Sequence, residues 1–113
     1  MNTLADFKPE PKPGDWFFVT SSERSYTKIV VTINEHGHLI QDTGHSSGKG
    51  NYFNPVKISK EEAREFLRKN IPKFEKNPRK TSTDEVLIRC MKRFYRDFFD
   101  EVLMGDNKTI PLR

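Results

Sequence analysis

The chain has 113 residues, of which 34% are hydrophobic, 32% are charged and 12% are aromatic. This length fits one domain with a small core and excludes a two-domain enzyme. Nine Phe residues argue against a disordered chain. No apolar run approaches the roughly 18 residues that a membrane helix needs.

The N-terminal residues 1–6 have neither the basic nor the apolar region of a secretory signal. Cys90 is the only cysteine, so no disulfide can form within the chain. Both features favour a reducing compartment, and we expect a cytoplasmic protein.

The formal net charge of +4 is unevenly distributed. Residues 57–80 carry nine basic and four acidic side chains, whereas residues 1–56 carry five and six, and residues 81–113 carry six of each. A clustered positive field attracts polyanions, so the middle segment points to nucleic acid. The alternative is that this charge only keeps the protein soluble.

The N-terminal half is expected to form an extended arm and then a sheet. Three prolines at alternate positions exclude a helix from residues 1–13. Alternating apolar residues separated by turn residues predict a sheet over residues 14–58. Its strands are expected at 16–20, 26–34, 38–42 and 52–58. The first is apolar on both faces, so it should be buried on both sides or covered by the arm, and Pro55 places the last at a sheet edge.

Two helices are expected to follow. Ser59 and Glu62 have the spacing of a capping box, in which each side chain satisfies a free backbone N–H of the first turn. We predict a helix over residues 59–71, closed by Pro72, and then a basic linker over residues 72–80.

The second helix is the longer one. A capping box from Ser82 to Glu85 opens a helix over residues 83–104, and Gly105 is a natural stop. Residues 106–113 are expected to form a tail.

These elements predict an α+β fold in a single domain over residues 14–105. About four strands form a twisted antiparallel meander, either open or closed into a barrel, and the two helices follow it. An antiparallel sheet with helices on one face leaves its other face open to bind something.

The long helix carries an unusually wide apolar arc. The arc comprises Val86, Leu87, Cys90, Met91, Phe94, Tyr95, Phe98, Phe99, Val102 and Leu103. It exceeds the roughly 100° that packing on one side of a sheet requires. The excess is covered either within the chain or by a second copy in a homodimer.

The opposite side of this helix carries a basic stripe of Arg89, Lys92, Arg93 and Arg96. Such a stripe can contact phosphates, which Arg binds in a bidentate manner. In the alternative, ion pairs at i,i+4 spacing neutralise it and the face is ordinary solvated surface. The expected pairs are Glu85–Arg89, Arg93–Asp97 and Arg96–Asp100, with Glu61–Arg64 and Glu65–Lys69 on the preceding helix.

The linker region is the first candidate for a phosphate contact. Its basic residues are Lys69, Lys73, Lys76, Arg79 and Lys80. Only Glu75 opposes them locally, so their charge is less neutralised than that of the helices.

A glycine-rich loop over residues 43–51 resembles a nucleotide-binding loop only superficially. It has three residues where the phosphate-binding pattern needs four, and it leads into a strand instead of a helix. A looser role remains, in which His45 and Lys49 hold an anionic ligand.

No metal, cofactor or catalytic site is expected. His36 and His38 share one side of a strand, but Gly37 interrupts it and no cysteine is near. Cys90 lies on the apolar arc and reads as a small buried residue. No acid, base and nucleophile come together in the sequence, so we predict no enzyme.

Aromatic and basic residues alternate on the sheet. Tyr26, Lys28 and Thr32 share the polar face of the second strand, and Tyr52 is expected to join them from a neighbouring strand. Such a surface can stack unpaired bases. The alternative is that the tyrosines border the core with their hydroxyls in water.

The leading hypothesis is a small non-enzymatic protein that binds single-stranded or duplex nucleic acid through the linker. The glycine-rich loop and the basic stripe would assist. The alternative is a small inhibitor or accessory factor that binds a larger protein complex through the aromatic helix face or a sheet edge.

Overall fold

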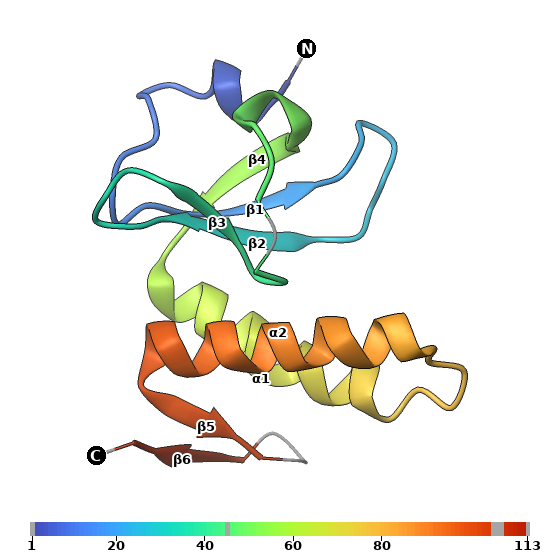
Figure 1. Ribbon diagram of the computed structural model, residues 1–113. Coiled ribbons are helices and arrows are strands. Elements are labelled where there is room, and N and C mark those ends of the chain that lie inside the picture. Colours follow the sequence, from blue (N-terminus) through green and yellow to red (C-terminus); the bar gives the residue numbers. More distant parts are fainter. Residues whose placement is uncertain (1, 45, 105–107, 113) are drawn as a thin grey trace. The chain divides into compact units, whose positions relative to one another are not determined.

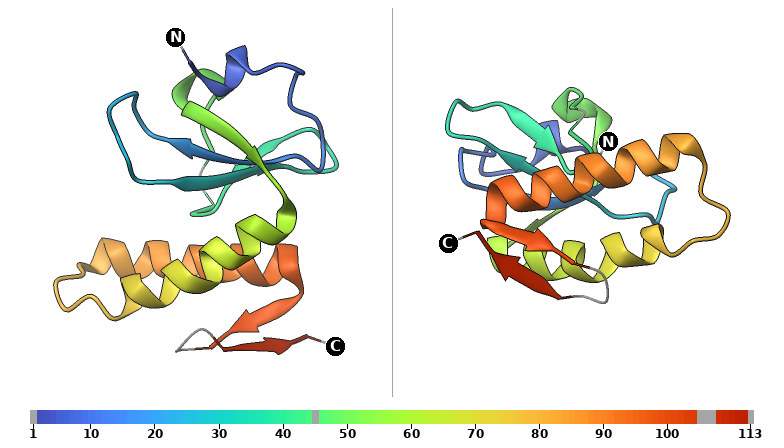
Figure 2. Two further views of the ribbon diagram at one scale, coloured as in Figure 1. Left: turned by 180° about the vertical axis from the view of Figure 1, so that it is seen from behind. Right: turned by 60° about the horizontal axis from the view of Figure 1, so that its bottom comes forward.

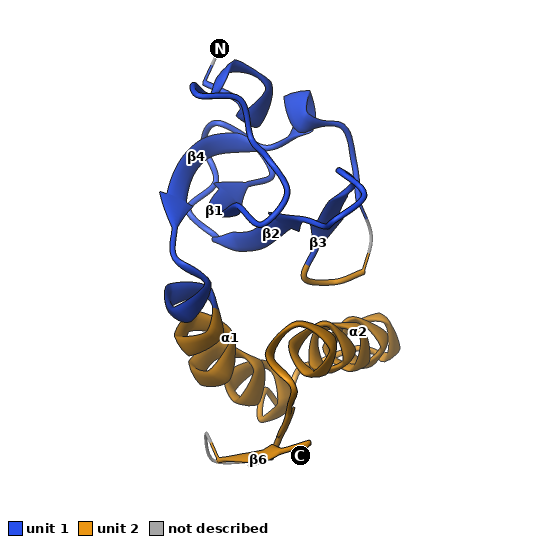
Figure 3. Cartoon of the chain, turned by 90° about the vertical axis from the view of Figure 1, so that its left-hand side faces the viewer, with its two compact units in different colours: residues 1–41, 45–63 blue, residues 42–44, 64–113 orange. Residues whose placement is uncertain are grey.

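The computed structural model describes residues 2–44, 46–104 and 108–112. The chain divides into two compact units (Figure 3). Unit 1 comprises residues 1–41 and 45–63, and unit 2 comprises residues 42–44 and 64–113.

Unit 1 contains the predicted four-stranded antiparallel sheet (Figure 1). Its strands are β1 (Trp16–Thr20), β2 (Ile29–Ile33), β3 (Leu39–Gln41) and β4 (Phe53–Ile58). Their spatial order is β3-β2-β1-β4, so the fourth strand returns to pair with the first. This is the order of a Greek key, and it corrects the expected simple meander. Over the described ranges the sheet is open, with β3 at one edge and β4, which contains Pro55, at the other.

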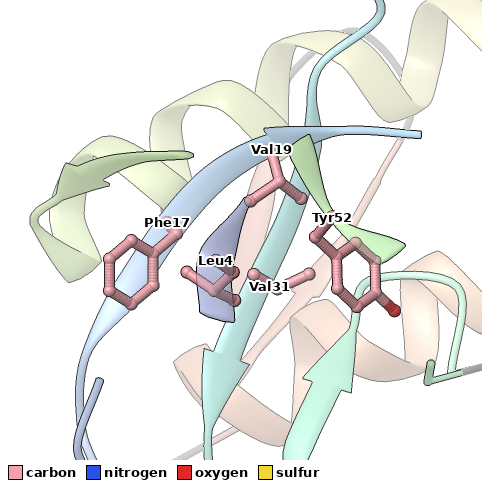
Figure 4. Packing of buried hydrophobic residues seen from close by; sticks show 5 residues of the cluster. All are labelled: Leu4, Phe17, Val19, Val31 and Tyr52. Carbon is pink, nitrogen blue, oxygen red and sulfur yellow. The ribbon is translucent and has the colours of Figure 1, made fainter. Parts of the chain in front are cut away.

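One face of the sheet is covered by the N-terminal arm (Figure 4). The cluster on this face consists of Leu4, Phe17, Val19, Val31 and Tyr52. Leu4 donates its N–H to the Tyr52 carbonyl at 2.8 Å, and the Phe7 ring meets the Phe17 ring edge-on at 5.0 Å. The arm is not extended throughout, because Leu4–Asp6 form a turn of 3-10 helix, η1. The prolines lie after this turn and do not constrain it.

The other face of the sheet is buried along its middle. Trp16, Val30 and Thr32 are all buried, and the Thr32 hydroxyl donates to the Asp15 carbonyl at 2.8 Å. Thr32 is therefore not part of an exposed polar face, contrary to the expectation. A threonine can be buried here because its hydroxyl finds a backbone acceptor.

α1 (Lys60–Glu75) begins at the predicted capping box and ends later than predicted. The Ser59 hydroxyl accepts from the Glu62 N–H at 3.0 Å, and Glu62 Oε1 accepts from the Ser59 N–H at 3.2 Å. The helix then continues through Pro72, where the sequence predicts its end. Pro72 has no N–H to donate to the Arg68 carbonyl, but the turn that follows it still closes, because the Lys76 N–H donates to the Pro72 carbonyl at 3.1 Å.

α2 (Ser82–Phe99) is capped one residue earlier than predicted. The Thr81 hydroxyl accepts from the Asp84 N–H at 3.2 Å, and Asp84 Oδ2 accepts from the Thr81 N–H at 2.9 Å. Thr81–Asp84 and the predicted Ser82–Glu85 pair both have capping-box spacing, so local sequence does not decide between them.

α2 ends at Phe99, before the predicted end at residue 104. Asp100 adopts a left-handed conformation with φ 54°, which Asp tolerates better than most residues. The predicted stop, Gly105, lies outside the described residues.

The chain continues as a hairpin of β5 (Glu101–Leu103) and β6 (Thr109–Pro111) (Figure 2). Residues 101–103 are thus a strand and not the last turn of a helix, and residues 109–111 are a strand and not part of a tail. Period-two alternation in such short segments is too weak a signal to be recognised.

Most of the apolar arc of α2 is buried in the chain. Met91, Phe94 and Tyr95 of the arc are buried, and Cys90, Phe98 and Phe99 are half-buried. Ile88, which was not expected in the arc, is buried as well. Val86 and Leu87 remain exposed near the start of the helix. Val102 and Leu103, which were expected to extend the arc, belong to β5 instead.

A network of charged side chains ties β5 to both helices. Glu101 accepts hydrogen bonds from Arg64 Nε at 3.0 Å, from Arg64 Nη2 at 2.8 Å and from the Tyr95 hydroxyl at 2.5 Å. The hydrogen bonds from Arg64 lower the pKa of Glu101, and burial raises the pKa of Tyr95. A further ion pair, from Lys92 to Glu75 at 2.6 Å, joins α2 to the end of α1.

Candidate nucleic-acid interface

The five candidates of the linker region lie in unit 2, on the second half of α1 and in the connection to α2. We call Lys69, Lys73, Lys76, Arg79 and Lys80 the basic segment. All five are exposed. Lys69 and Lys73, at i and i+4, lie on one side of α1, and Lys76 follows directly after the end of the helix.

Other cations hold the two carboxylates nearest to the basic segment. Glu75, the one local counter-charge in the sequence, binds Lys92 of α2. Glu65 accepts hydrogen bonds from Arg64 and Arg68, and the bond from Arg68 lowers its pKa. The ion pair expected between Glu65 and Lys69 is not formed, because the two guanidinium groups already hold this carboxylate.

Three cations of the basic segment consequently lack an ion-pair partner. Within the described residues, no carboxylate lies within 4.0 Å of Lys69, Lys73 or Arg79. Lys80 has a structural contact, since its Nζ donates to the Glu75 carbonyl at the end of α1 at 2.6 Å. A cation at a helix C-terminus also interacts favourably with the helix dipole.

The basic stripe of α2 is exposed at Arg89, Arg93 and Arg96. Over the described ranges, Arg89 and Arg93 have no carboxylate within 4.0 Å, so their expected pairs with Glu85 and Asp97 are not formed. Arg96 lies 3.4 Å from the Asp97 carboxylate instead of pairing with Asp100. Exposed pairs gain little free energy, so these side chains extend into water.

Lys92, the fourth member of the stripe, has a different environment. It is half-buried and engaged with Glu75, as described above. It joins the two helices and contributes less positive charge to the surface than its three neighbours.

Of the two candidates on the glycine-rich loop, only Lys49 lies among the described residues. Lys49 lies in a 3-10 turn, η2 (Lys49–Asn51), with its Nζ 3.9 Å from a Glu10 carboxylate oxygen of the arm. His45 lies outside the described residues. The loop therefore offers a lysine that already has a weak ion pair.

Tyr52 is not on the binding face that the sequence predicts. Its side chain is only 3% exposed, and its hydroxyl donates to Gln41 Oε1 at 2.8 Å and accepts from the Ser47 N–H at 3.0 Å. The turn before β4 directs the ring into the core (Figure 4). Tyr52 is therefore not available to stack on a base.

Tyr26 and Lys28 both line an open cavity of about 450 Å³ in unit 1. The Tyr26 side chain is 96% exposed, and Lys28 Nζ lies 5.0 Å from the centre of the Phe18 ring. The lining residues are Phe18, Val19, Thr20, Glu23, Ser25, Tyr26, Lys28, Asn54 and Val56.

Phe18 and Asn54 are members of this cavity that sequence reasoning missed. Phe18 of β1 is paired with Val30 of β2 and Val56 of β4. Alternation along β1 could have shown that Phe18 lies on the opposite face of the sheet from Phe17 and Val19. Asn54 has a positive φ of 53°, and its amide donates to the Thr20 hydroxyl and the Glu23 carbonyl, which holds the β1–β2 connection.

His36, His38 and Cys90 are the other residues considered in the sequence for metal or thiol chemistry. The described residues contain no group of three or more metal-ligating side chains, and His36 and His38 are exposed with ring centres 6.3 Å apart. Cys90 is half-buried.

Two broader observations complete the description of the chain. No helix in the described ranges has the length and apolar character needed to cross a membrane. Comparisons with protein-family models, curated proteins and solved structures find no match to this chain.

Proposed function

We propose that this protein is a small, non-enzymatic, cytoplasmic protein that binds nucleic acid through the basic segment. The observation that carries the proposal is the set of three exposed cations, Lys69, Lys73 and Arg79, without an ion-pair partner among the described residues. Phosphates are the natural counter-charges for such a group, because each contact releases a condensed counterion.

The exposed arginines of α2 add to this interaction. Arg89 and Arg93 present guanidinium groups that can bind phosphate oxygens in a bidentate manner. These contacts position the protein on the nucleic acid and carry no base specificity.

The cavity of unit 1 supports a preference for unpaired bases. Tyr26 offers an exposed ring on which a base can stack, and Lys28 adds a positive charge beside Phe18. Duplex bases are stacked on one another and do not offer their faces to such a ring.

The alternative, a protein-interaction module that uses the aromatic face of α2, has less support. Met91, Phe94 and Tyr95 of that face are buried in the chain, which leaves Val86 and Leu87 as its exposed part on α2. One sheet edge is also partly covered, since Asn54 donates its N–H to the Asn2 carbonyl and Phe53 bridges to Thr3.

Fluorescence anisotropy with labelled single-stranded and duplex oligonucleotides, between 50 and 200 mM salt, tests the proposal. The variant carries Lys69→Glu and Lys73→Glu, and the matched control carries Lys8→Glu and Lys12→Glu on the exposed arm. Both lower the formal net charge by four, from +4 to 0. We expect the first pair to weaken binding at least about tenfold and to reduce the salt slope by about one per lost contact, and the control to have a small effect.

An equal loss of affinity in the two double variants would show that net charge, and not the basic segment, drives the binding. No binding at low salt would refute the proposal. Tyr26→Ala is expected to weaken single-stranded binding by about 1–3 kcal/mol and to leave duplex binding unchanged. Tyr26→Phe, which keeps the ring, should bind like the wild type.

A further inference from the structure

The hairpin of unit 2 has one face that neither helix covers. Glu101 bonds to Arg64 and Tyr95, and Leu103 is buried, so the odd-numbered residues of β5 point toward the helices. Alternation along a strand then places the even-numbered residues on the opposite face, away from α1 and α2.

This outer face is apolar along its middle. Val102 and Ile110 are directly opposite one another, and the ladder continues through a bond from the Met104 N–H to the Lys108 carbonyl at 2.7 Å and one from the Leu112 N–H to the Asp100 carbonyl at 3.0 Å. The four apolar side chains are exposed: Val102 37%, Met104 44%, Ile110 52% and Leu112 50%. We call these four residues the hairpin patch.

The hairpin patch is unfavourable in water as it stands. A two-stranded sheet is marginal unless its faces are packed, and contiguous exposed apolar side chains mark interaction sites. A nucleic acid fits this face poorly, because Lys108 at one end is the one cation among its described residues and Asp100 at the other end repels phosphates.

The charges at the two ends of the outer face favour one occupant. Asp100 is opposite Leu112 at one end, and Lys108 is opposite Met104 at the other. A two-fold axis that runs across the strands through the Val102–Ile110 pair exchanges these ends. It therefore brings the acidic end of one copy next to the basic end of the other, with the apolar side chains between them.

We propose that a second copy of this chain packs on the hairpin patch, so that the protein forms a two-fold symmetric dimer through β5 and β6. This interface is distinct from the long-helix seam considered from the sequence. Four side chains bury less than the roughly 800 Å² per partner of a standard interface, so the dimer should be weak and should form at roughly 100 µM and above.

Sedimentation velocity on the full chain, from about 5 to 500 µM, tests this inference. The variant Ile110→Lys places like charges on either side of the proposed axis. The matched control is Val56→Lys, the same kind of change at an exposed strand position of β4 in unit 1. We expect wild type and Val56→Lys to pass from monomer to dimer, and Ile110→Lys to stay monomeric throughout.

A wild type that remains monomeric at 500 µM would overturn the inference. So would a dimer that Ile110→Lys leaves intact, since the contact would then lie elsewhere. If circular dichroism shows that Ile110→Lys is unfolded, Leu112→Lys replaces it with the same expected result.

Charge-swapped variants test the two-fold arrangement itself. Ile110→Lys and Ile110→Glu should each be monomeric alone, because the axis sets each residue against its own copy. An equal mixture should associate more strongly than either variant. If the mixture associates no more strongly than either variant alone, the proposed face-to-face dimer is wrong.

Discussion

Glu101 is the residue on which the contacts between α1, α2 and β5 converge. Its carboxylate accepts two hydrogen bonds from Arg64 and one from Tyr95. Hydrogen bonds to the ionised form stabilise it, which is why the pKa of Glu101 lies below its ordinary value of 4.5 despite partial burial.

This environment makes a pH-dependent prediction for Glu101→Gln. Because the pKa is lower in the folded chain than in the unfolded chain, the ionised carboxylate stabilises the fold at neutral pH. That stability is lost as the pH falls through the folded pKa. We expect the substitution to cost about 2 kcal/mol at pH 7 and the gap to wild type to narrow below pH 4.5.

Urea unfolding followed by circular dichroism at pH 7 and pH 3 measures this difference. Glu23→Gln, at an exposed position of unit 1, is the control and should stay within about 0.5 kcal/mol of wild type. A cost for Glu101→Gln that is the same at both pH values would contradict the electrostatic explanation.

At the scale of the element, the start of α2 can be tested with two adjacent residues. Thr81 makes the reciprocal capping bonds with Asp84, whereas Ser82 is the first residue of the helix. Thr81→Ala should lower the free energy of unfolding by about 1 kcal/mol, because the first turn loses a hydrogen-bond acceptor. Ser82→Ala should cost little, since Ala favours the helix interior.

Chemical denaturation of both variants decides between the two capping registers. If Ser82→Ala is the more destabilised, the cap lies where the local sequence first suggested. The same measurement on Ser59→Ala gives a reference value for a cap that sequence and structure share.

At the scale of the whole molecule, the two proposed associations should respond in opposite ways to salt. Phosphate contacts release counterions, so nucleic-acid binding weakens steeply as salt rises. The hairpin patch is apolar, and the ion pairs that Asp100 and Lys108 would add at its ends are exposed and contribute little. The dimer should therefore persist at high salt.

Raising sodium chloride from 50 to 500 mM should therefore abolish the anisotropy change and leave the sedimentation of the free protein close to that at low salt. Dimerisation that disappears in parallel with oligonucleotide binding would indicate that charge drives both, and would contradict an apolar interface.

Much of the fold follows from short-range patterns. Period-two alternation located the four strands of the sheet, and the spacing from Ser59 to Glu62 placed the start of α1. These signals suffice because each depends on residues within a few positions of one another. The sheet order does not follow from them, since the return of β4 to β1 joins segments more than 30 residues apart.

The candidate site, like the fold, follows only in part from the sequence. The sequence grouped Lys69 and Lys73 by charge but placed Lys73 in a linker, and only the longer α1 of the structure puts both on one side of a helix. That they lack an ion-pair partner among the described residues depends on where Glu65 and Glu75 are held, and the contact of Glu75 with Lys92 connects two helices. Tyr52 was misplaced for a related reason, because its burial depends on Leu4 and Gln41, which are distant in sequence.

The amino-acid sequence by itself determined the fold class, the clustering of positive charge and the exposure of the basic segment, because composition and periodicity act locally. Only the tertiary structure decided which of those charges are neutralised, and it converted the expected C-terminal tail into a hairpin with an apolar outer face. The reason is physical: an ion pair or a strand ladder forms between whichever groups the folded chain brings together, and their separation along the sequence does not reveal it.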